Sequence, residues 1–120
     1  MATLTVGLTL ASTDATADVL SVSLSDTLTT ALPSVGLSRA SIATTGETNI
    51  LTTADSGISY VYIRNTDGTN IVTVKTDGAV SVMDISPGEF AFFPLKGAVG
   101  LELTANSAAC IVEYAYWTKG

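Results

Sequence analysis

The chain has 120 residues, 47% of them hydrophobic, and 11 acidic against 5 basic side chains give it a formal net charge of −6. It contains no histidine and one cysteine, which excludes an intramolecular disulfide and removes the commonest general base and metal ligand. No basic run is present, so neither nucleic acid nor an anionic membrane surface is an expected partner. Charged residues make up only 13% of the chain, about half the usual share. A single domain spanning residues 1–120, with a weakly charged surface suited to packing against other protein, is therefore expected.

The N-terminal sequence MATLTVGLTLASTDA has no Lys or Arg before its apolar positions, and Thr interrupts them. It lacks the pattern of a secretion signal or a membrane span, so we expect synthesis in the cytoplasm. Leu4, Val6, Leu8 and Leu10 alternate with polar or small residues, which predicts a strand with one apolar face. Residues 1–16 have two interpretations: an N-terminal arm that adds to a neighbour's sheet, or an edge strand of the same domain.

Short strands follow along the rest of the chain. They are predicted at residues 20–24, 38–45, 49–53, 58–64, 70–75, 79–83, 90–95, 99–104 and 109–117. Residues 26–32 are predicted to form one helical turn that Pro33 stops. About 8–10 short antiparallel strands with no amphipathic helix indicate an all-β sandwich or barrel.

The tripeptide Thr-Asp-Gly occurs twice, at residues 66–68 and 76–78. Asp67-Gly68 and Asp77-Gly78 each fit a three-residue hairpin loop, since Gly accepts the left-handed conformation and Asp bonds nearby N–H groups. Successive hairpin turns lie at opposite ends of a strand, about 17–20 Å apart. The two aspartates are therefore interpreted as turn residues, because one carboxylate per loop is too few for a calcium site.

No catalytic constellation is evident. Without His, a base would have to be a carboxylate or one of Lys75, Lys96 and Lys119, and none of these lysines lies in a Ser-Lys motif. Cys110 is predicted to be a small buried apolar residue. Glu113 is interpreted either as part of a solvated strand face or as a partner of Arg39 or Arg64 at a subunit contact. We expect no enzyme activity, no cofactor and no metal.

The aromatic residues gather late in the chain. Alternation places Phe90 and Phe92 on one face of a strand, where core packing is predicted, and Phe93 on the other. Trp117 ends the last strand and is an interface candidate. The full set of interface candidates joins these late aromatics with the N-terminal apolar residues: Trp117, Tyr116, Tyr114, Phe93, Leu4, Val6 and Leu8.

Three segments, YVYIRN at 60–65, SPGEFAFFPL at 86–95 and AACIVEY at 108–114, resemble the capsid decoration (cement) proteins of tailed bacteriophages. The resemblance covers roughly residues 57–117. It implies a jelly-roll-like β-sandwich, often a homotrimer, that sits on the outer capsid of the virion and binds the phage major capsid protein. It carries no catalytic residues over to this chain.

Two other functions stay open. The first is a tail or neck structural protein of the same kind of virus, which similar strand patterns also fit. The second is a carbohydrate-binding β-sandwich module that uses Trp117 and Tyr116 as a stacking platform.

Overall fold

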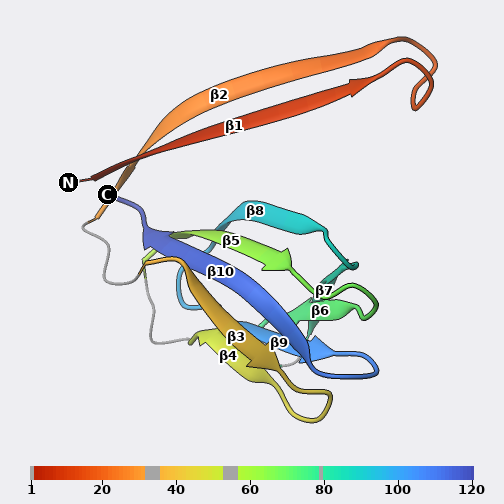
Figure 1. The fold of residues 1–120 in the computed structure, drawn as a ribbon. Coiled ribbons are helices and arrows are strands. Elements are labelled where there is room, and N and C mark those ends of the chain that lie inside the picture. Colours follow the sequence, from red (N-terminus) through yellow and green to blue (C-terminus); the bar gives the residue numbers. More distant parts are fainter. Residues whose placement is uncertain (1, 32–35, 53–56, 79) are drawn as a thin grey trace.

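The computed structural model describes residues 2–31, 36–52, 57–78 and 80–120, and these form strands and no helix (Figure 1). The predicted all-β class is confirmed, and every strand pair is antiparallel. The strands in chain order are β1 (Ala2–Ser12), β2 (Leu20–Thr30), β3 (Ser38–Ile42), β4 (Thr48–Leu51), β5 (Ser59–Asn65), β6 (Val72–Lys75), β7 (Ser81–Ile85), β8 (Phe90–Leu95), β9 (Leu101–Ala105) and β10 (Cys110–Thr118).

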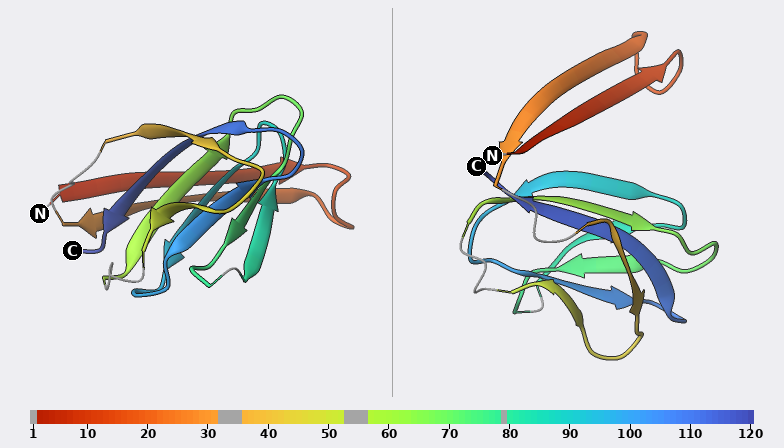
Figure 2. Two further views of the ribbon diagram at one scale, coloured as in Figure 1. Left: turned by 90° about the horizontal axis from the view of Figure 1, so that it is seen from below. Right: turned by 60° about the vertical axis from the view of Figure 1, so that its left-hand side comes forward.

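Two four-stranded sheets form a sandwich from residue 38 onwards. One sheet has the order β3-β10-β5-β8 and the other has the order β4-β9-β6-β7. Figure 2 shows these sheets as two layers, with the chain passing repeatedly from one to the other. Their inward-facing side chains form one core: Ile42, Leu51, Val61, Ile63, Val72, Val74, Ile85, Leu101, Leu103, Ala105, Cys110 and Val112. Cys110 is thus a buried apolar residue, as expected, and burial raises the pKa of its thiol.

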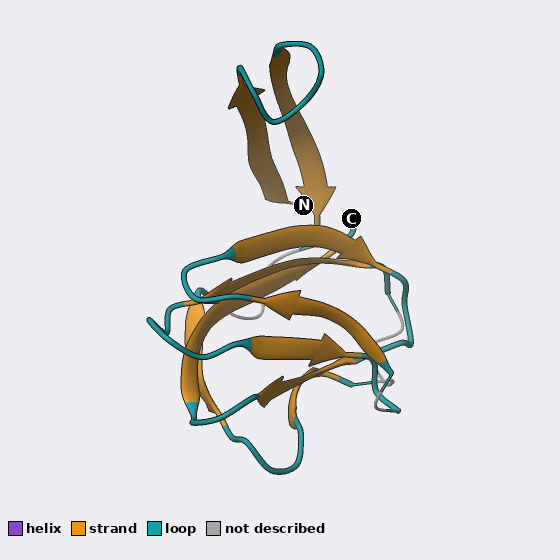
Figure 3. Cartoon of the chain, turned by 90° about the vertical axis from the view of Figure 1, so that its right-hand side faces the viewer, coloured by secondary structure: helices purple, strands orange, loops and turns teal. Residues whose placement is uncertain are grey.

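β1 and β2 form a separate two-stranded hairpin that stands away from the sandwich (Figures 1 and 3). Its register runs without a break from Ala2↔Thr30 to Ser12↔Leu20. The helical turn predicted from residue 26 is wrong over the described residues, because β2 continues to Thr30. The alternation of Leu24, Asp26 and Leu28 keeps the period of a strand, and β1 supplies a pairing partner for each residue.

The base of the hairpin is joined to the C-terminal end of β10. Thr30 pairs with Lys119 in an isolated bridge. The Ala31 N–H donates to the Thr118 carbonyl over 2.8 Å, and the Gly120 N–H donates to the Thr29 carbonyl over 2.9 Å. Thr30 is buried as a result. The hairpin therefore leaves the sandwich from a fixed point.

The two Thr-Asp-Gly tripeptides have different roles. Asp77-Gly78 lies between β6 and β7, which pair as a hairpin, and Gly78 has φ = 125°. Asp67-Gly68 lies between β5 and β6, which belong to different sheets, so the hairpin predicted there is wrong. The tripeptide is the same at both places, but β5 and β6 lie in opposite layers of the sandwich.

Candidate interaction surface

The hairpin has one apolar face and one hydroxyl-rich face. Cross-strand partners share a face in an antiparallel pair, and Leu4↔Leu28, Leu8↔Leu24 and Leu10↔Val22 are such pairs. The apolar face, called the hairpin face below, consists of Leu4, Val6, Leu8, Leu10, Leu20, Val22, Leu24 and Leu28. The opposite face carries small residues, nearly all Thr or Ser: Thr3, Thr5, Gly7, Thr9, Ala11, Ser21, Ser23, Ser25, Thr27 and Thr29. The hairpin thus has the pattern of a strand pair that buries one side only.

The hairpin face is only partly covered by the rest of the chain. Leu8 is 44% exposed, Leu10 46% and Leu24 63%. One carboxylate interrupts the face, because Asp26 lies opposite Val6. Such a contiguous row of exposed aliphatic side chains is uncommon on a monomer and typically marks a contact surface.

A second apolar surface lies on the outer side of the β3-β10-β5-β8 sheet. The register places Tyr60 beside Pro94 and Trp117, Tyr62 beside Phe92, and Arg64 beside Phe90. The aromatic face, as we call it, consists of Tyr60, Tyr62, Phe90, Phe92, Pro94 and Trp117. It is ordered by ring stacking: the Tyr60 and Phe92 centroids are 6.2 Å apart with planes 9° apart, and Phe92 and Trp117 are 6.5 Å apart.

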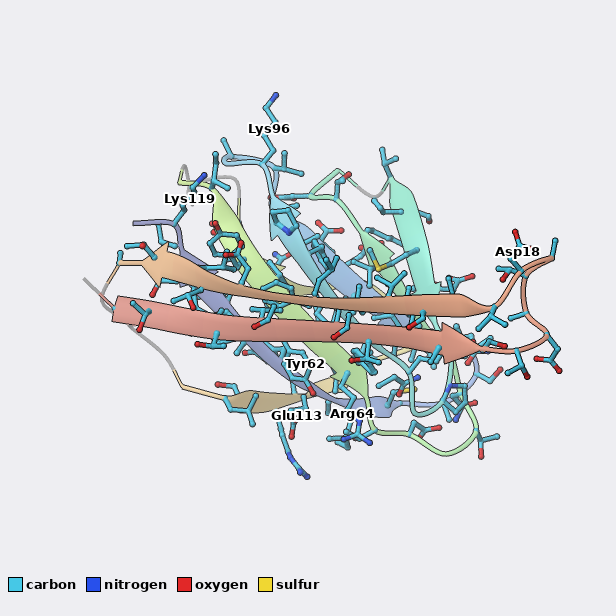
Figure 4. The ribbon with its side chains drawn as sticks, turned by 90° about the horizontal axis from the view of Figure 1, so that it is seen from above. Asp18, Tyr62, Arg64, Lys96, Glu113 and Lys119 are labelled. Atoms are coloured by element: carbon cyan, nitrogen blue, oxygen red, sulfur yellow. The ribbon has the colours of Figure 1, made fainter. Side chains whose placement is uncertain are left out.

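The hairpin face and the aromatic face point toward each other across an open hollow. This hollow has a volume of about 470 Å³ and is lined mainly by apolar residues: Val6, Leu8, Leu24, Leu28, Tyr60, Phe92 and Pro94, together with Ser25 and Asp26. Figure 4 shows the hairpin passing over the sheet that carries Tyr62, Arg64 and Glu113. The two surfaces are thus close enough to line one hollow.

A charged cluster borders the aromatic face. Glu113 accepts a hydrogen bond from the Tyr62 hydroxyl over 3.0 Å, and its other oxygen lies 3.7 Å from Arg39 Nη2. Burial and the bond to Glu113 raise the pKa of Tyr62, so the phenol stays protonated and keeps donating. Glu113 is thus paired with Arg39 inside one chain. Arg64 lies beside Glu113 in the register but makes no ion pair within the described residues.

The interface residues predicted from the sequence fall into two groups. Leu4, Val6 and Leu8 lie on the hairpin face, and Trp117 lies on the aromatic face. Phe93, Tyr114 and Tyr116 instead pack against the core. Trp117 and Tyr116 therefore lie on opposite faces of β10, and the stacking platform they were predicted to form together is wrong.

The core packing predicted for Phe90 is also wrong, since its side chain is 68% exposed. Phe92 lies on the same outer face and is partly buried. Sequence reasoning missed Tyr60, Tyr62 and Pro94 on this face. Alternation in Tyr60-Val61-Tyr62-Ile63-Arg64 was the available signal, because it places both tyrosines opposite the buried Val61 and Ile63.

Two further acidic side chains, Asp67 and Glu102, have structural neighbours that shift their pKa values. Asp67 accepts hydrogen bonds from the backbone N–H groups of Asn70 and Thr69 over 2.6 and 2.8 Å, which lowers the pKa of its carboxyl group. Burial raises the pKa of Glu102, and neighbouring Asp77 and Glu47 add to the rise. Across the residues that the structure describes, no group of three or more His, Cys, Asp or Glu side chains is placed to hold a metal.

The same described residues include no helix long and apolar enough to span a membrane. Comparison of the chain with models of protein families, with curated proteins and with solved structures finds no match.

Proposed function

We propose that this chain is a structural virion protein that binds the outside of a phage capsid and stabilises contacts between major capsid proteins. The observation that carries the proposal is the hairpin of β1 and β2, which leaves the sandwich and exposes an apolar face. An arm of this kind suits a protein whose partner is another protein surface, because the arm gains its burial only on contact.

The strand orders β3-β10-β5-β8 and β4-β9-β6-β7 support the jelly-roll part of the proposal. Eight strands divided in this way between two sheets occur in viral capsid and lectin domains. A fold by itself does not define a function. The proposal therefore rests on the exposed arm, and the strand order adds support to it.

The absence of enzyme activity is part of the same proposal. The groups with shifted pKa values, Tyr62, Asp67, Glu102 and Cys110, each have a local structural cause for the shift.

A protein that binds only the assembled shell stabilises that shell by linkage. Its contact would depend on apolar burial, so the bound protein should resist release by moderate salt.

The test is the location and copy number of the protein on particles of the phage that encodes it. Quantitative mass spectrometry and antibody labelling of purified virions would measure both. Hundreds of copies on the shell support a decoration protein. A dozen copies or fewer on the tail or neck favour the tail or neck alternative, and absence from the particle contradicts both.

A second candidate, a carbohydrate-binding module, is favoured by one observation. Tyr60 and Phe92 stack with nearly parallel rings beside Trp117, in the wall of the hollow between hairpin and sandwich, and aromatic rings of this kind can support a sugar. A glycan array is the direct test. Binding that is lost on Phe92→Ala substitution would support this candidate, and an array without signal would remove it.

A further inference from the structure

The hairpin extends further than the sandwich can cover. β1 and β2 have 11 residues each, whereas the longest strand of the sandwich, β10, has nine. At about 3.3 Å per residue the hairpin is about 36 Å long. Its base cannot slide, because Thr30 and Ala31 are bonded to the end of β10. Figures 1 and 4 show its tip, with Asp18, beyond the sandwich.

Within the described residues, the distal part of the hairpin face lines no hollow together with residues of its own sandwich. Sandwich residues line hollows together with hairpin residues as far as Leu8 and Leu24. Leu10, Leu20 and Val22 lie nearer the tip. Closure of the hairpin onto its own sheet would bury the proximal residues and leave these three outside the contact.

Charge indicates what kind of surface could cover them. Residues 2–31 contain three aspartates, Asp14, Asp18 and Asp26, and no Lys or Arg. Two hairpins packed face to face would bring six carboxylates together with no cation, which is unfavourable. A basic or neutral apolar surface is therefore the better match.

The chain itself carries such a surface at one end of its aromatic face. Phe90 is the most exposed aromatic residue there, and Arg64 is its cross-strand partner. A hollow of about 440 Å³ is lined by Tyr62, Arg64, Gly88 and Phe90. Both arginines of the chain, Arg39 and Arg64, lie on this sheet. An exposed ring beside a guanidinium complements the distal aliphatic residues and the neighbouring tip loop, which carries Asp14 and Asp18.

We propose that the distal hairpin face of one copy docks on the Phe90–Arg64 end of the aromatic face of a second copy. The donor and acceptor are different patches, so copies associate by reciprocal exchange of hairpins, in a closed ring or in an open chain. This self-association concerns contacts between copies of this chain and does not depend on the proposed binding to a capsid.

Light scattering of the full-length protein after gel filtration is the first test. We expect a molar mass of at least two chains. This mass should fall toward that of one chain as the protein is diluted. A mass of one chain at every concentration measured would overturn the proposal.

Paired substitutions locate the contact. Leu10→Asp with Val22→Asp alters a cross-strand pair on the distal hairpin face, and the association constant is expected to fall by at least about tenfold. Thr9→Asp with Ser23→Asp is the matched control, since it adds the same charge to the adjacent cross-strand pair on the opposite face. The control is expected to associate like the wild type. An equal loss in both variants would overturn the assignment of the face.

Disulfide trapping between chains identifies the acceptor. A Val22→Cys chain and a Phe90→Cys chain are mixed and oxidised, with Cys110 protected by burial. A mixed dimer on a non-reducing gel is expected, because each chain holds only one half of the new bridge. No mixed dimer, together with bridging inside a single chain that carries both substitutions, would mean that the hairpin closes on its own sheet, and would overturn the proposal.

Discussion

At the scale of single residues, the two Thr-Asp-Gly tripeptides have the same sequence but different backbone conformations. Gly78 has φ = 125°, a region that residues with a Cβ rarely adopt, whereas Gly68 does not have a positive φ. A Cβ added at either glycine would meet no heavy atom within 4 Å. Both positions therefore have room for an alanine side chain, but only at Gly78 would alanine strain the backbone.

This difference gives a paired prediction. Gly78→Ala should lower the free energy of unfolding by about 1–3 kcal/mol, because alanine must adopt the strained conformation. Gly68→Ala should leave it unchanged or raise it by up to about 1 kcal/mol through a less flexible unfolded chain. Urea denaturation of both variants measures the difference, and equal effects would contradict it.

Asn65 carries a second prediction at this scale. Its buried amide donates to the carbonyls of Asn70 and Ile85 over 2.8 and 3.0 Å, and its oxygen accepts from the Asp67 N–H over 3.0 Å. Asn65→Ala would leave these three backbone groups without their partner. We expect a loss of about 3 kcal/mol in the free energy of unfolding, measured by denaturation, against less than about 0.5 kcal/mol for the exposed control Thr16→Ala.

Glu102 predicts a dependence on pH. It is only 9% exposed and lies near Asp77 and Glu47, so the folded protein favours its protonated form and raises its pKa. A carboxyl group with a raised folded pKa destabilises the fold as pH increases from the unfolded value, near 4.5, through the higher folded value. Glu102→Gln should remove this loss.

The variant should therefore be more stable than the wild type at pH 8 and similar to it at pH 4. Denaturation at both pH values is the measurement. Asp18→Asn at the exposed hairpin tip is the control and should show no such difference. A variant that is less stable than the wild type at pH 8 would show that the negative charge of Glu102 is favourable in the fold.

At the scale of elements, the hairpin differs from every sandwich strand. An isolated two-stranded sheet is marginally stable in water, and this one is tied to the sandwich chiefly at its base. We expect the amide hydrogens of β1 and β2 to exchange at least about a hundredfold faster than those of β5 and β10. Hydrogen exchange with mass spectrometry measures this, and similar protection in both regions would contradict it.

Sequence reasoning found both hairpin strands but misjudged the second. The prediction ended at residue 24 because Asp26 is rare inside strands and Pro33 suggested a helical stop. Leu28 continued the alternation, and this signal was available. What the sequence could not supply was the pairing with β1, since register is a property of two segments together.

At the scale of the whole molecule, we expect the sandwich to fold without the hairpin of β1 and β2. The buried core contains no side chain from β1 or β2. A chain without residues 2–29 keeps Thr30 and its pairing with Lys119, so we expect it to fold and to show the near-ultraviolet circular dichroism of packed aromatic residues. It should also be monomeric by light scattering. Loss of that signal would show that the hairpin is part of the folding unit.

The fold class and most strand positions could be predicted because period-2 alternation is local, as in residues 90–95. The assignment of β5 and β6 to different sheets could not be predicted. A turn sequence such as Thr66-Asp67-Gly68 does not encode which layer the next strand joins. The aromatic face was missed for a related reason: Phe90 and Phe92 look like core residues until the outer side of the sheet is known.

The base of the hairpin also brings the two ends of the chain together. Ala2 pairs with Thr30 on one side, and Lys119 pairs with Thr30 on the other, so the two ends are two strand spacings apart, about 10 Å. A linker of a few residues could therefore join them into a circular permutant, with new ends opened in the loop between β6 and β7. In such a permutant the hairpin becomes an internal segment. A protein fused to the new ends would then be attached beside β6 and β7 and not beside the base of the hairpin.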